Sequence, residues 1–389
     1  MTRMADVALA PQLVTLAPLP VFRPTVGVLG WRISAYHLCG VVGWIAGISL
    51  ALVLTAGQSV PLWMTGLLAV ESIATFLALV MAEKVVSGEE NIVYYHHEIA
   101  VVSVSALTVW CLGAPVLPYL DAVMLGLGLF LACGRVGCFL VGCCHGQPHR
   151  WGVCYGLEHA DAGFARHLVG VRLFPIQLVE AVIVLATVVV GTILVLRGAP
   201  AGTALAVYSF AYGTVRVALE FVRGDSIRPY WHGVSEAQWT SLAIMLALLG
   251  LGGVGSAPGG RWLSVATLGV GFTLVAWAIT DGARRARFRP RHVREIADLL
   301  ERMAATARLA GGVHIGRTSL GLRISASVVG DGGRWLELFG ISDEAIPLDD
   351  AAAGRLARLM SRLRRANAEG TLARGRHSVY HLILPVAGR

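Results

Sequence analysis

The sequence predicts an all-α integral membrane protein, a helical bundle of seven or eight transmembrane helices that carries a small C-terminal α+β domain. Of the 389 residues, 56% are hydrophobic and only 14% are charged, and the mean hydropathy is +0.67. Ordinary soluble domains contain about 25% charged residues, and disordered chains are poor in hydrophobic ones. Uncharged stretches of about 20 residues, long enough to cross a bilayer as a helix, recur along the chain. These observations exclude a purely soluble enzyme and a disordered protein.

The charge distribution divides the chain into an apolar body and a basic tail. Residues 1–280 hold 13 Lys and Arg against 13 Asp and Glu, whereas residues 281–389 hold 19 against 11 and carry the whole net charge of +8. We therefore expect three parts: an N-terminal segment (1–33), a transmembrane domain (34–280) and a basic soluble α+β domain of unknown role (281–389).

An arginine cluster marks the boundary between body and tail. It consists of Arg284, Arg285, Arg287 and Arg289. Pro290 follows and would stop a helix that leaves the bilayer. The cluster is either a stop-transfer anchor for the last span or a site for acidic lipid. Nothing aromatic is interleaved that would favour nucleic acid, so no nucleic-acid partner is expected.

A window of about 19 residues finds eight candidate spans. They cover residues 36–56, 61–81, 99–117, 122–140, 174–196, 203–221, 238–254 and 262–279. Most connections are short, so the helices are expected to pack as an antiparallel bundle. Two connectors are longer, 82–98 and 141–173, and the second is rich in Gly, His and Cys. Long polar connectors over a bundle often carry the chemistry.

The tail shows the patterns of a water-soluble fold. Residues 293–309 repeat apolar side chains at helical spacing, and residues 320–329 and 379–384 alternate as strands do. Another basic helix is expected over 350–368. This α+β domain contains no nucleotide, nucleophile or metal motif, so a structural or interaction role is expected for it.

Charged residues inside the predicted spans provide the strongest functional signal. They are Glu71, Arg135, Glu180, Arg216 and Glu220, and Arg223 follows one turn further along the chain. Such a charge is costly at the bilayer centre unless it is paired or lines a wet cavity. Arg216 and Glu220 stand four residues apart on one helical face and can pair. One interpretation is that these charges form structural ion pairs between helices. The other is that they bind an anionic headgroup, because one guanidinium group can donate two parallel hydrogen bonds to phosphate oxygens.

Three motifs follow one another along the body. The block at 134–146 reads Gly-Arg-Val-Gly-Cys-Phe-Leu-Val-Gly-Cys-Cys-His-Gly, and the segment at 174–180 reads Phe-Pro-Ile-Gln-Leu-Val-Glu. The third motif contains Tyr212, Gly213, Arg216, Glu220, Phe221 and Arg223. Together with Tyr36, Gln238 and Ser241, these motifs resemble the prolipoprotein diacylglyceryl transferases, membrane enzymes that lipidate bacterial lipoproteins. The resemblance covers roughly residues 34–255.

The resemblance implies a reaction and its partners. A diacylglyceryl group would pass from phosphatidylglycerol to the thiol of a lipobox cysteine in the signal-peptide region of a prolipoprotein, with release of glycerol phosphate. It implies a multi-pass protein of a bacterial inner membrane, surrounded by membrane lipid, and no cofactor. Glycerol phosphate leaves as an anion, so positive charge near the phosphate would favour the reaction.

The resemblance also implies roles for individual residues. The catalytic residues would be His97, Arg135, Arg216 and Glu220. His97 would act as the base for the thiol, the two arginines would neutralise the departing phosphate, and Glu220 would orient Arg216. The substrate-binding residues would be Tyr36, Arg135, Cys138, Gly142, Gly146, Gln177, Glu180, Arg216 and Arg223.

The chain departs from the family at positions that bear on the chemistry. Cys138 stands where the family has Asn, Cys143 where it has Glu, and the family's His-Gly-Gly segment is reduced to His97-Glu98-Ile99. His96 and His97 also fit an interfacial helix start. Both phosphate-binding arginines are kept, so the pattern supports lipid binding more strongly than the transfer step. A paralogue that acts on another acceptor is the alternative.

A rival hypothesis starts from cysteines and histidines that are close in sequence. The candidate ligands are Cys138, Cys143, Cys144, His145, His149 and Cys154. Thiolates and imidazoles hold zinc or Cu(I), which would make the chain a membrane metal-binding, transport or thiol-redox protein. However, the spacing matches no ordinary zinc motif, and adjacent cysteines seldom bind one tetrahedral ion. A disulfide that involves Cys143 or Cys144 and plain packing are the other interpretations, and no metal site is expected.

The predicted topology contains a conflict. The positive-inside rule places the arginine-rich start of the tail in the cytoplasm, and eight spans then put the N-terminus and the long connectors there too. The resemblance instead puts the active-site connectors on the outer face. Either one span too many is predicted, within 238–279, or the tail faces outward.

Overall fold

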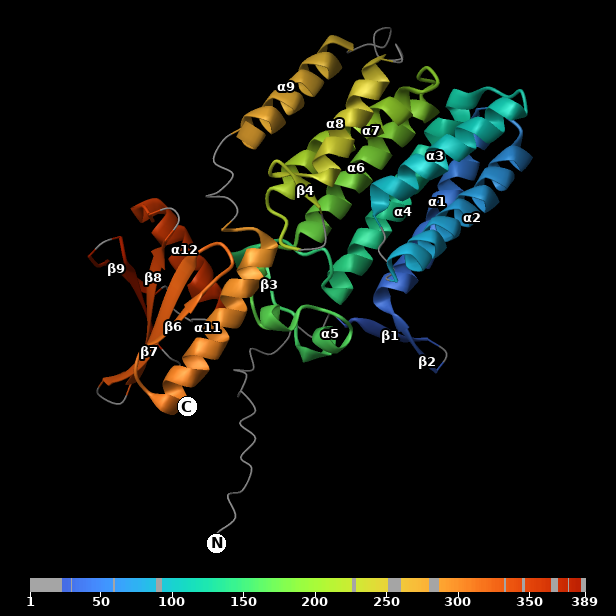
Figure 1. The fold of residues 1–389 in the computed structure, drawn as a ribbon. Coiled ribbons are helices and arrows are strands. Elements are labelled where there is room, and N and C mark those ends of the chain that lie inside the picture. Colours follow the sequence, from blue (N-terminus) through green and yellow to red (C-terminus); the bar gives the residue numbers. More distant parts are fainter. Residues whose placement is uncertain are drawn as a thin grey trace.

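The computed structural model describes residues 23–28, 30–58, 60–88, 93–225, 229–250, 260–279, 287–331, 334–344, 347–364, 370–376 and 378–385. A helical bundle occupies one part of the molecule, and a sheet with two helices occupies another (Figure 1). A hairpin of β1 (Thr25–Val28) and β2 (Trp31–Ser34) leads into the bundle. Most of the expected N-terminal segment, and Arg284 and Arg285 of the arginine cluster at the boundary, lie outside the described residues.

Each of the eight predicted spans corresponds to a helix of the bundle. The helices are α1 (Ala35–Gly57), α2 (Leu62–Ser87), α3 (Tyr94–Cys111), α4 (Val116–Val141), α6 (Ile176–Leu196), α7 (Thr203–Glu220), α8 (Glu236–Gly250) and α9 (Gly260–Ile279). Among the described residues, α1, α2, α4 and α6 are long and apolar enough to cross a membrane. The prediction of a mostly helical membrane protein is confirmed, whereas the number of seven or eight spans stays a prediction.

Glycines allow α1 and α4 to approach each other closely. A Cβ on Gly47 of α1 would lie 2.5 Å from the carbonyl oxygen of Gly126 in α4. Nearer the end of α4, a Cβ on Gly137 would lie 3.0 Å from the Cα of Tyr36. Small residues permit this backbone contact between membrane helices. The start of α1 is thereby held against the last turns of α4, where the first sequence motif begins.

The C-terminal region contains a five-stranded antiparallel sheet with the order β6-β7-β8-β10-β9. Its strands are β6 (His314–Arg317), β7 (Leu322–Asp331), β8 (Arg334–Asp343), β9 (Thr371–Arg374) and β10 (Tyr380–Pro385), and its helices are α11 (Pro290–Ala310) and α12 (Asp350–Leu363). Side chains of both helices share a core with the sheet. The alternation in the sequence predicts β7 and β10, but it misses the two short edge strands β6 and β9 and also β8, in which the buried Glu337 binds Arg308 and Arg364.

Successive helices of the bundle alternate in direction, so the two long connectors lie at one end (Figure 1). Gln177, at the start of α6, donates a hydrogen bond to the carbonyl of Cys143, just after α4. At the opposite end, Asp121 near the start of α4 accepts hydrogen bonds from the backbone N–H groups of Gly202 and Leu205 at the start of α7, each 2.7 Å long. We call the end that holds the connectors the connector end.

The C-terminal region packs against the connector that follows α4. Phe164 and Leu168 of this connector belong to the same buried cluster as Ile296 of α11 and Phe339 of β8. Arg362 of α12 also donates a 2.7 Å hydrogen bond to the carbonyl of Pro148. The tail and the connector therefore lie together at the connector end, so a membrane topology of this chain has to place both on the same side.

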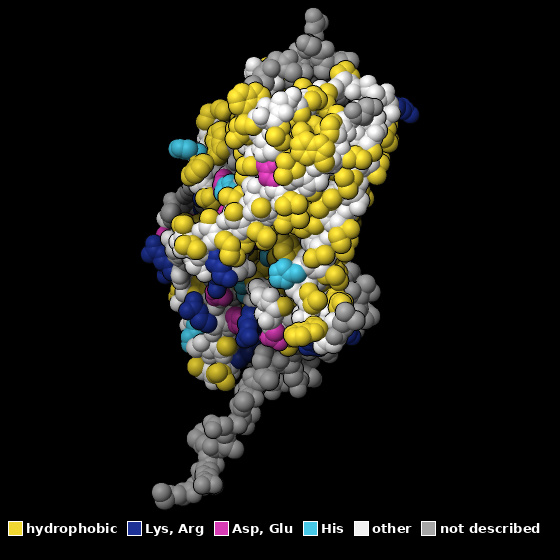
Figure 2. All heavy atoms as spheres, turned by 90° about the vertical axis from the view of Figure 1, so that its right-hand side faces the viewer, with side chains coloured by type: hydrophobic (Ala, Val, Ile, Leu, Met, Phe, Trp, Pro, Cys, Tyr) yellow, Lys and Arg dark blue, Asp and Glu magenta, His cyan; other side chains and the backbone are white. Residues whose placement is uncertain are grey.

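The outer surface of the bundle is apolar. Figure 2 shows hydrophobic side chains over the bundle, whereas Lys and Arg gather around the C-terminal region. Exposed residues of this surface include Val41, Ile45 and Val53 on α1 and Val70 and Leu77 on α2. An apolar surface of this extent suits acyl chains rather than water.

Replacing Gly47 by Ala is expected to loosen the contact between α1 and α4. The new Cβ would collide with backbone that cannot move as a side chain can, at a cost of about 1–3 kcal/mol in the free energy of unfolding. Gly66→Ala in α2 is the matched control, because nothing lies within 4 Å of its Cβ position. Thermal unfolding in detergent micelles should show a lower Tm for Gly47→Ala only. Equal Tm values for the two variants would contradict this account of the contact.

Candidate active site

Backbone hydrogen bonds join the connector after α4 to the start of α6 and the end of α7. The N–H of Gly146 donates to the carbonyl of Phe174 (3.1 Å), and the N–H of Gln147 donates to that of Val222 (2.9 Å). A Cβ on Gly146 would lie 2.6 Å from the Phe174 oxygen, so this approach requires glycine. The three sequence motifs therefore meet at one place in the structure.

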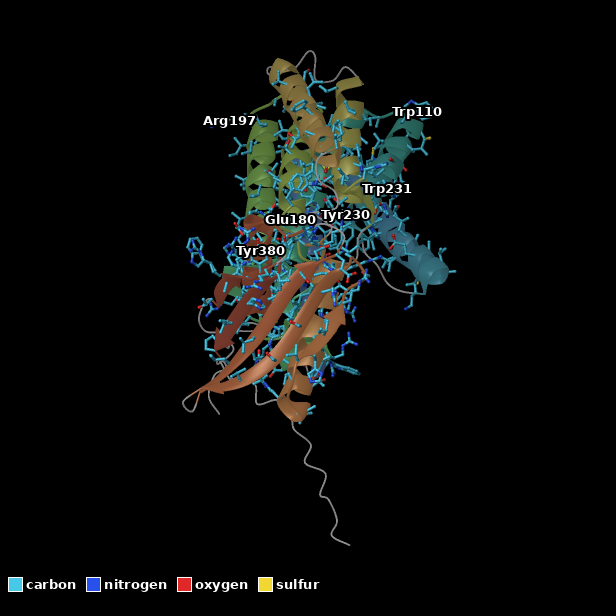
Figure 3. The ribbon with its side chains drawn as sticks, turned by 60° about the vertical axis from the view of Figure 1, so that its left-hand side comes forward. Trp110, Glu180, Arg197, Tyr230, Trp231 and Tyr380 are labelled. Carbon is cyan, nitrogen blue, oxygen red and sulfur yellow. The ribbon has the colours of Figure 1, made fainter. Side chains whose placement is uncertain are left out.

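Glu180, in the first turns of α6, connects the arginines of two other helices. One of its carboxylate oxygens lies 3.0 Å from Nε of Arg135 in α4, and the other lies 4.0 Å from Nε of Arg216 in α7. The hydroxyl of Tyr212 donates a 3.0 Å hydrogen bond to the same carboxylate. All four side chains are buried. Figure 3 shows Glu180 at the level where the helices meet the C-terminal region.

Two further carboxylates hold the arginines at the end of α7. Glu220 pairs with Arg216 one turn earlier, and the same oxygen lies 3.9 Å from Nη1 of Arg223. Arg223 also pairs with Asp225. We call these three arginines and three acids the ion-pair cluster: Arg135, Glu180, Arg216, Glu220, Arg223 and Asp225. Because it joins three cations to three anions, its formal charge is zero.

Some N–H groups of the ion-pair cluster have no acceptor. Among the described residues, Nη1 of Arg216 and Nη1 of Arg223 donate no hydrogen bond, although these residues are only 1% and 3% exposed. A buried donor without an acceptor costs about 1–3 kcal/mol, and more when it is charged. Phosphate oxygens match the fork of a guanidinium group. The arrangement is therefore suited to binding an oxyanion.

The other predicted substrate-binding residues lie around the ion-pair cluster. Tyr36 packs beside Gly137 and interacts electrostatically with Arg135. Gly142 ends α4 in the left-handed conformation, with a φ of 85°. Gln177 holds the following turn through its bond to the Cys143 carbonyl (2.7 Å). The structure thus gathers the residues of the three motifs at the connector end.

His97 lies apart from the ion-pair cluster. Its Nδ1 is 3.0 Å from the carbonyl of Val93, and its ring packs 4.4 Å from that of Phe76 in α2. Its Nε2 is buried and has no hydrogen-bond partner in the part of the chain that the structure describes. The next residue, Glu98, interacts electrostatically with Tyr212, which contacts the cluster. His96 is exposed and binds Glu236 at 2.7 Å.

The six candidate metal ligands divide into two groups. The sulfur atoms of Cys138, Cys143 and Cys144 all lie within 4.8 Å of one another. His145 turns its Nδ1 to the carbonyl of Gly146 (2.9 Å), and burial lowers the pKa of its imidazole. The remaining two candidates, His149 and Cys154, do not join the three sulfur atoms in the described structure.

Sequence reasoning missed residues that complete the site. Asp225 follows Arg223 by two positions and holds it, and this short spacing was the available signal. Tyr94 and Tyr208 pack around Tyr212, with ring centroids 5.8 Å from it in both cases. The contact of Tyr94 depends on how α3 and α7 meet, which the sequence does not reveal. Tyr208 precedes Tyr212 by one turn of α7, so the spacing of four residues was the available signal.

Part of the chain matches a known protein family. Residues 92–252 match the family model for prolipoprotein diacylglyceryl transferase. This match confirms the resemblance that the motifs predict. The matched segment contains every member of the ion-pair cluster, whereas Tyr36 lies outside it.

Individual relatives carry the same name. The phosphatidylglycerol–prolipoprotein diacylglyceryl transferase of Clostridium tetani is 31% identical over 110 residues, which are 28% of this chain and 43% of that protein. Those of two Dehalococcoides mccartyi strains, BAV1 and 195, are 32% identical over 126 residues and 33% identical over 129 residues. These alignments cover 32% and 33% of this chain and 46% and 47% of those proteins. The chain thus spans less than half the length of the curated relatives it matches.

Replacing Glu180 by Gln is expected to destabilise the protein, because Arg135 and Arg216 would lose a carboxylate they share. Breaking a buried ion pair by removing one partner costs about 3–5 kcal/mol. Glu71→Gln is the matched control, since Glu71 accepts a 3.0 Å hydrogen bond from Thr108 that a Gln oxygen can also accept. Thermal unfolding should separate the two variants. A Tm for Glu180→Gln as high as that for Glu71→Gln would show that Glu180 does not hold the arginines.

Proposed function

We propose that this chain is a phosphatidylglycerol:prolipoprotein diacylglyceryl transferase-like enzyme that crosses a bacterial inner membrane several times. The observation that carries the proposal is the buried ion-pair cluster, in which Arg216 and Arg223 each keep an N–H group that no acceptor of the described residues binds. The family match over residues 92–252 supports the same reaction. The names of the relatives supply the two substrates, phosphatidylglycerol and a prolipoprotein.

The ion-pair cluster would bind the phosphodiester of phosphatidylglycerol. Arg135, Arg216 and Arg223 supply the positive charge. The phosphate oxygens would accept hydrogen bonds from the Nη1 groups of Arg216 and Arg223. Glu180 contacts Arg135 and Glu220 contacts Arg216, and these ion pairs would fix the orientation of the guanidinium planes. A site that is already oriented loses little conformational entropy when it binds the anion.

An apolar pocket beside α4 would receive hydrocarbon from the same lipid. It lies between α1, α2 and α4, and Trp44, Leu68 and Leu127 are among the residues that line it. Trp44 also contacts Phe76, whose ring packs on His97. This arrangement would place the acyl chains among the helices and the headgroup at the connector end.

The proposed reaction forms a carbon–sulfur bond. The thiolate sulfur of the acceptor attacks the carbon of the diacylglycerol unit that is bonded to the phosphate, and the bond between this carbon and the phosphate oxygen breaks. Glycerol phosphate leaves with the electron pair, and its growing negative charge is stabilised by Arg135 and Arg216. His97 is the proposed base that takes the thiol proton, which then leaves to solvent.

The acceptor would approach from the connector end. The C-terminal region packs on the connector after α4 at that end, next to the segment that carries the first motif. We assign the acceptor as the cysteine in the signal-peptide region of a prolipoprotein. A paralogue that uses another thiol is the second candidate. It is favoured by the departures from the family pattern at Cys138, at Cys143 and in the segment His97-Glu98-Ile99.

Loss of Arg135 or Arg216 is expected to abolish transfer. Removing one group that stabilises the developing charge costs about 10²–10³ in kcat. The assay would follow diacylglyceryl transfer to a lipobox peptide in micelles that contain phosphatidylglycerol, with Arg135→Ala and Arg216→Ala. Arg197→Ala is the matched control, because Arg197 is exposed at the opposite end of the bundle (Figure 3). Full activity of the first two variants would overturn the lipid-binding role.

The His97 assignment has a separate test. His97→Gln removes the base, and such losses reduce the rate by about 10²–10⁴. His96→Gln is the control, since His96 is the neighbouring exposed histidine. The rate of transfer should fall only for His97→Gln, and the loss should shrink at high pH, where the thiol ionises without help. A loss that is the same at every pH would assign His97 a packing role against Phe76.

A further inference from the structure

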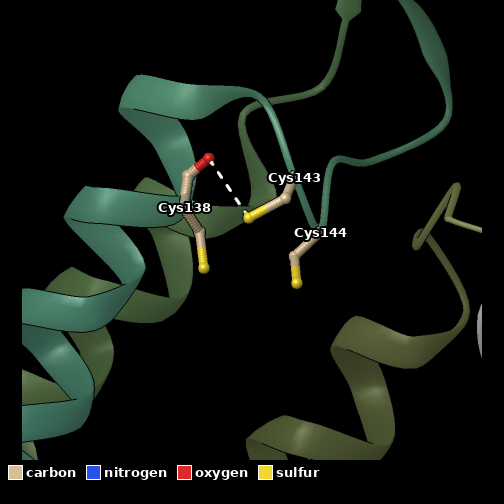
Figure 4. A group of neighbouring side chains, drawn as sticks. All are labelled: Cys138, Cys143 and Cys144. Atoms are coloured by element: carbon tan, nitrogen blue, oxygen red, sulfur yellow. Dashed lines mark hydrogen bonds between the residues drawn. The ribbon is translucent and has the colours of Figure 1, made fainter. Parts of the chain in front are cut away.

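Three cysteines form a compact cluster beside the ion-pair cluster. Their sulfur atoms lie within 4.8 Å of one another (Figure 4). Cys138 comes from the last turn of α4, and Cys143 and Cys144 come from the turn that follows it. None of the three is in a disulfide. We call Cys138, Cys143 and Cys144 the cysteine triad.

The backbone of this turn brings two adjacent cysteines to one point. Gly142 and Cys144 both have left-handed conformations, with φ values of 85° and 53°. A residue other than glycine pays about 1–2 kcal/mol for this conformation, so it is uncommon. Consecutive cysteines usually point apart, which is why the sequence alone argues against a shared ligand site. The bent turn removes that objection, since all three sulfur atoms face the same space (Figure 4).

The dimensions of the cysteine triad suit a metal ion bound by thiolates. Zinc–sulfur bonds of about 2.3 Å place three sulfur ligands about 4 Å apart, so a modest contraction would bring the triad to this spacing. No fourth His, Cys, Asp or Glu of the described chain joins the three sulfur atoms. Structural zinc sites are closed by four protein ligands, whereas catalytic sites have three and keep one position open. The cysteine triad, with three protein ligands, matches a catalytic zinc site.

Two arginines lie close to the cysteine triad. Arg135 interacts electrostatically with Cys138 and Cys144, and Arg223 interacts with Cys144. Both arginines belong to the ion-pair cluster. The triad therefore lies beside the groups that would hold the phosphate of the lipid.

We propose that the cysteine triad binds one Zn²⁺ ion and that the open fourth position takes the thiol of the acceptor. This inference rests on the proposed function, because it assigns the acceptor a place beside the lipid phosphate. A thiol bound to zinc is deprotonated at neutral pH, so zinc supplies the activation that a thiol needs. Cys138 and Cys143 stand where the family has Asn and Glu. These two replacements would then activate the same thiol nucleophile by a different route, through a metal ion.

The step balances without an oxidant or a reductant. The acceptor thiol binds to Zn²⁺ and releases its proton to the base. Its sulfur then attacks the carbon of the diacylglycerol unit that is bonded to the phosphate. The bond between this carbon and the phosphate oxygen breaks, and glycerol phosphate leaves with the electron pair. The thioether product is a weaker zinc ligand than the thiolate and dissociates, which leaves the ion and its three cysteine ligands unchanged.

The first test is metal binding by the full chain, purified in detergent with its thiols reduced. Elemental analysis and competition with a chromogenic zinc chelator should give one Zn²⁺ per chain. Cys138→Ser, Cys143→Ser and Cys144→Ser should each weaken binding at least tenfold. Cys154→Ser is the matched control in the same connector and should bind as the unaltered protein does. A folded, reduced protein that binds no stoichiometric zinc overturns the proposal.

The second test addresses the open position. With Co²⁺ in place of zinc, the unaltered protein should show the absorption of a tetrahedral thiolate site. A lipobox peptide with its cysteine should change this spectrum, and the same peptide with Ser in place of Cys should leave it as it was. An unchanged spectrum with the Cys peptide would show that the ion does not take the acceptor thiol.

An assay of diacylglyceryl transfer then distinguishes failure of the zinc proposal from failure of the proposed transferase function. Zinc binding and the peptide-induced spectral change without any transfer would retain the metal site and refute the transferase. Transfer at an undiminished rate after the zinc has been removed would retain the transferase and refute the role of the ion. Loss of transfer on zinc removal, with recovery when Zn²⁺ is added back, is the result expected here.

Discussion

The buried ion-pair cluster is the interaction on which the arrangement of this molecule depends. Helices α4, α6 and α7 and the segment just after α7 contribute its charges, and Glu180 stands between Arg135 of α4 and Arg216 of α7. Buried charges are tolerated only when partners are close, so the helix ends must stay in register for the cluster to exist. The glycines of the connector serve the same purpose, because Gly146 lets backbone hydrogen bonds tie the helix ends together.

The sequence reveals most of the bundle and the members of the cluster, for physical reasons that are easy to state. Apolar stretches must become helices in a membrane, and charges such as Arg216 and Glu180 inside them must find partners. The sequence does not reveal which acid binds which arginine, because this depends on how three helices meet. It also misses Asp225, although that residue stands only two positions after Arg223. Strand β8 escapes the periodicity because the buried Glu337 occupies a position where alternation expects an apolar residue.

Adjacent cysteines illustrate a different limit. From the sequence, a common metal site for Cys143 and Cys144 is disfavoured, because adjacent cysteines seldom bind one tetrahedral ion. The left-handed conformation of Cys144 reverses this expectation, and backbone conformation of a single residue cannot be read from a pattern. His97 shows a further limit: its place along the chain is plain from the sequence, but its packing against Phe76 depends on how α2 and α3 meet.

The reaction itself is the central claim, and phosphorus NMR tests it most directly. Phosphatidylglycerol carries a phosphodiester, whereas the glycerol phosphate that the proposed transfer releases carries a phosphomonoester, and the two have distinct resonances. With the purified protein and a lipobox peptide, we predict a phosphomonoester signal that grows in step with the thioether-modified peptide and requires the cysteine of that peptide. A folded protein that produces no phosphomonoester would contradict the account.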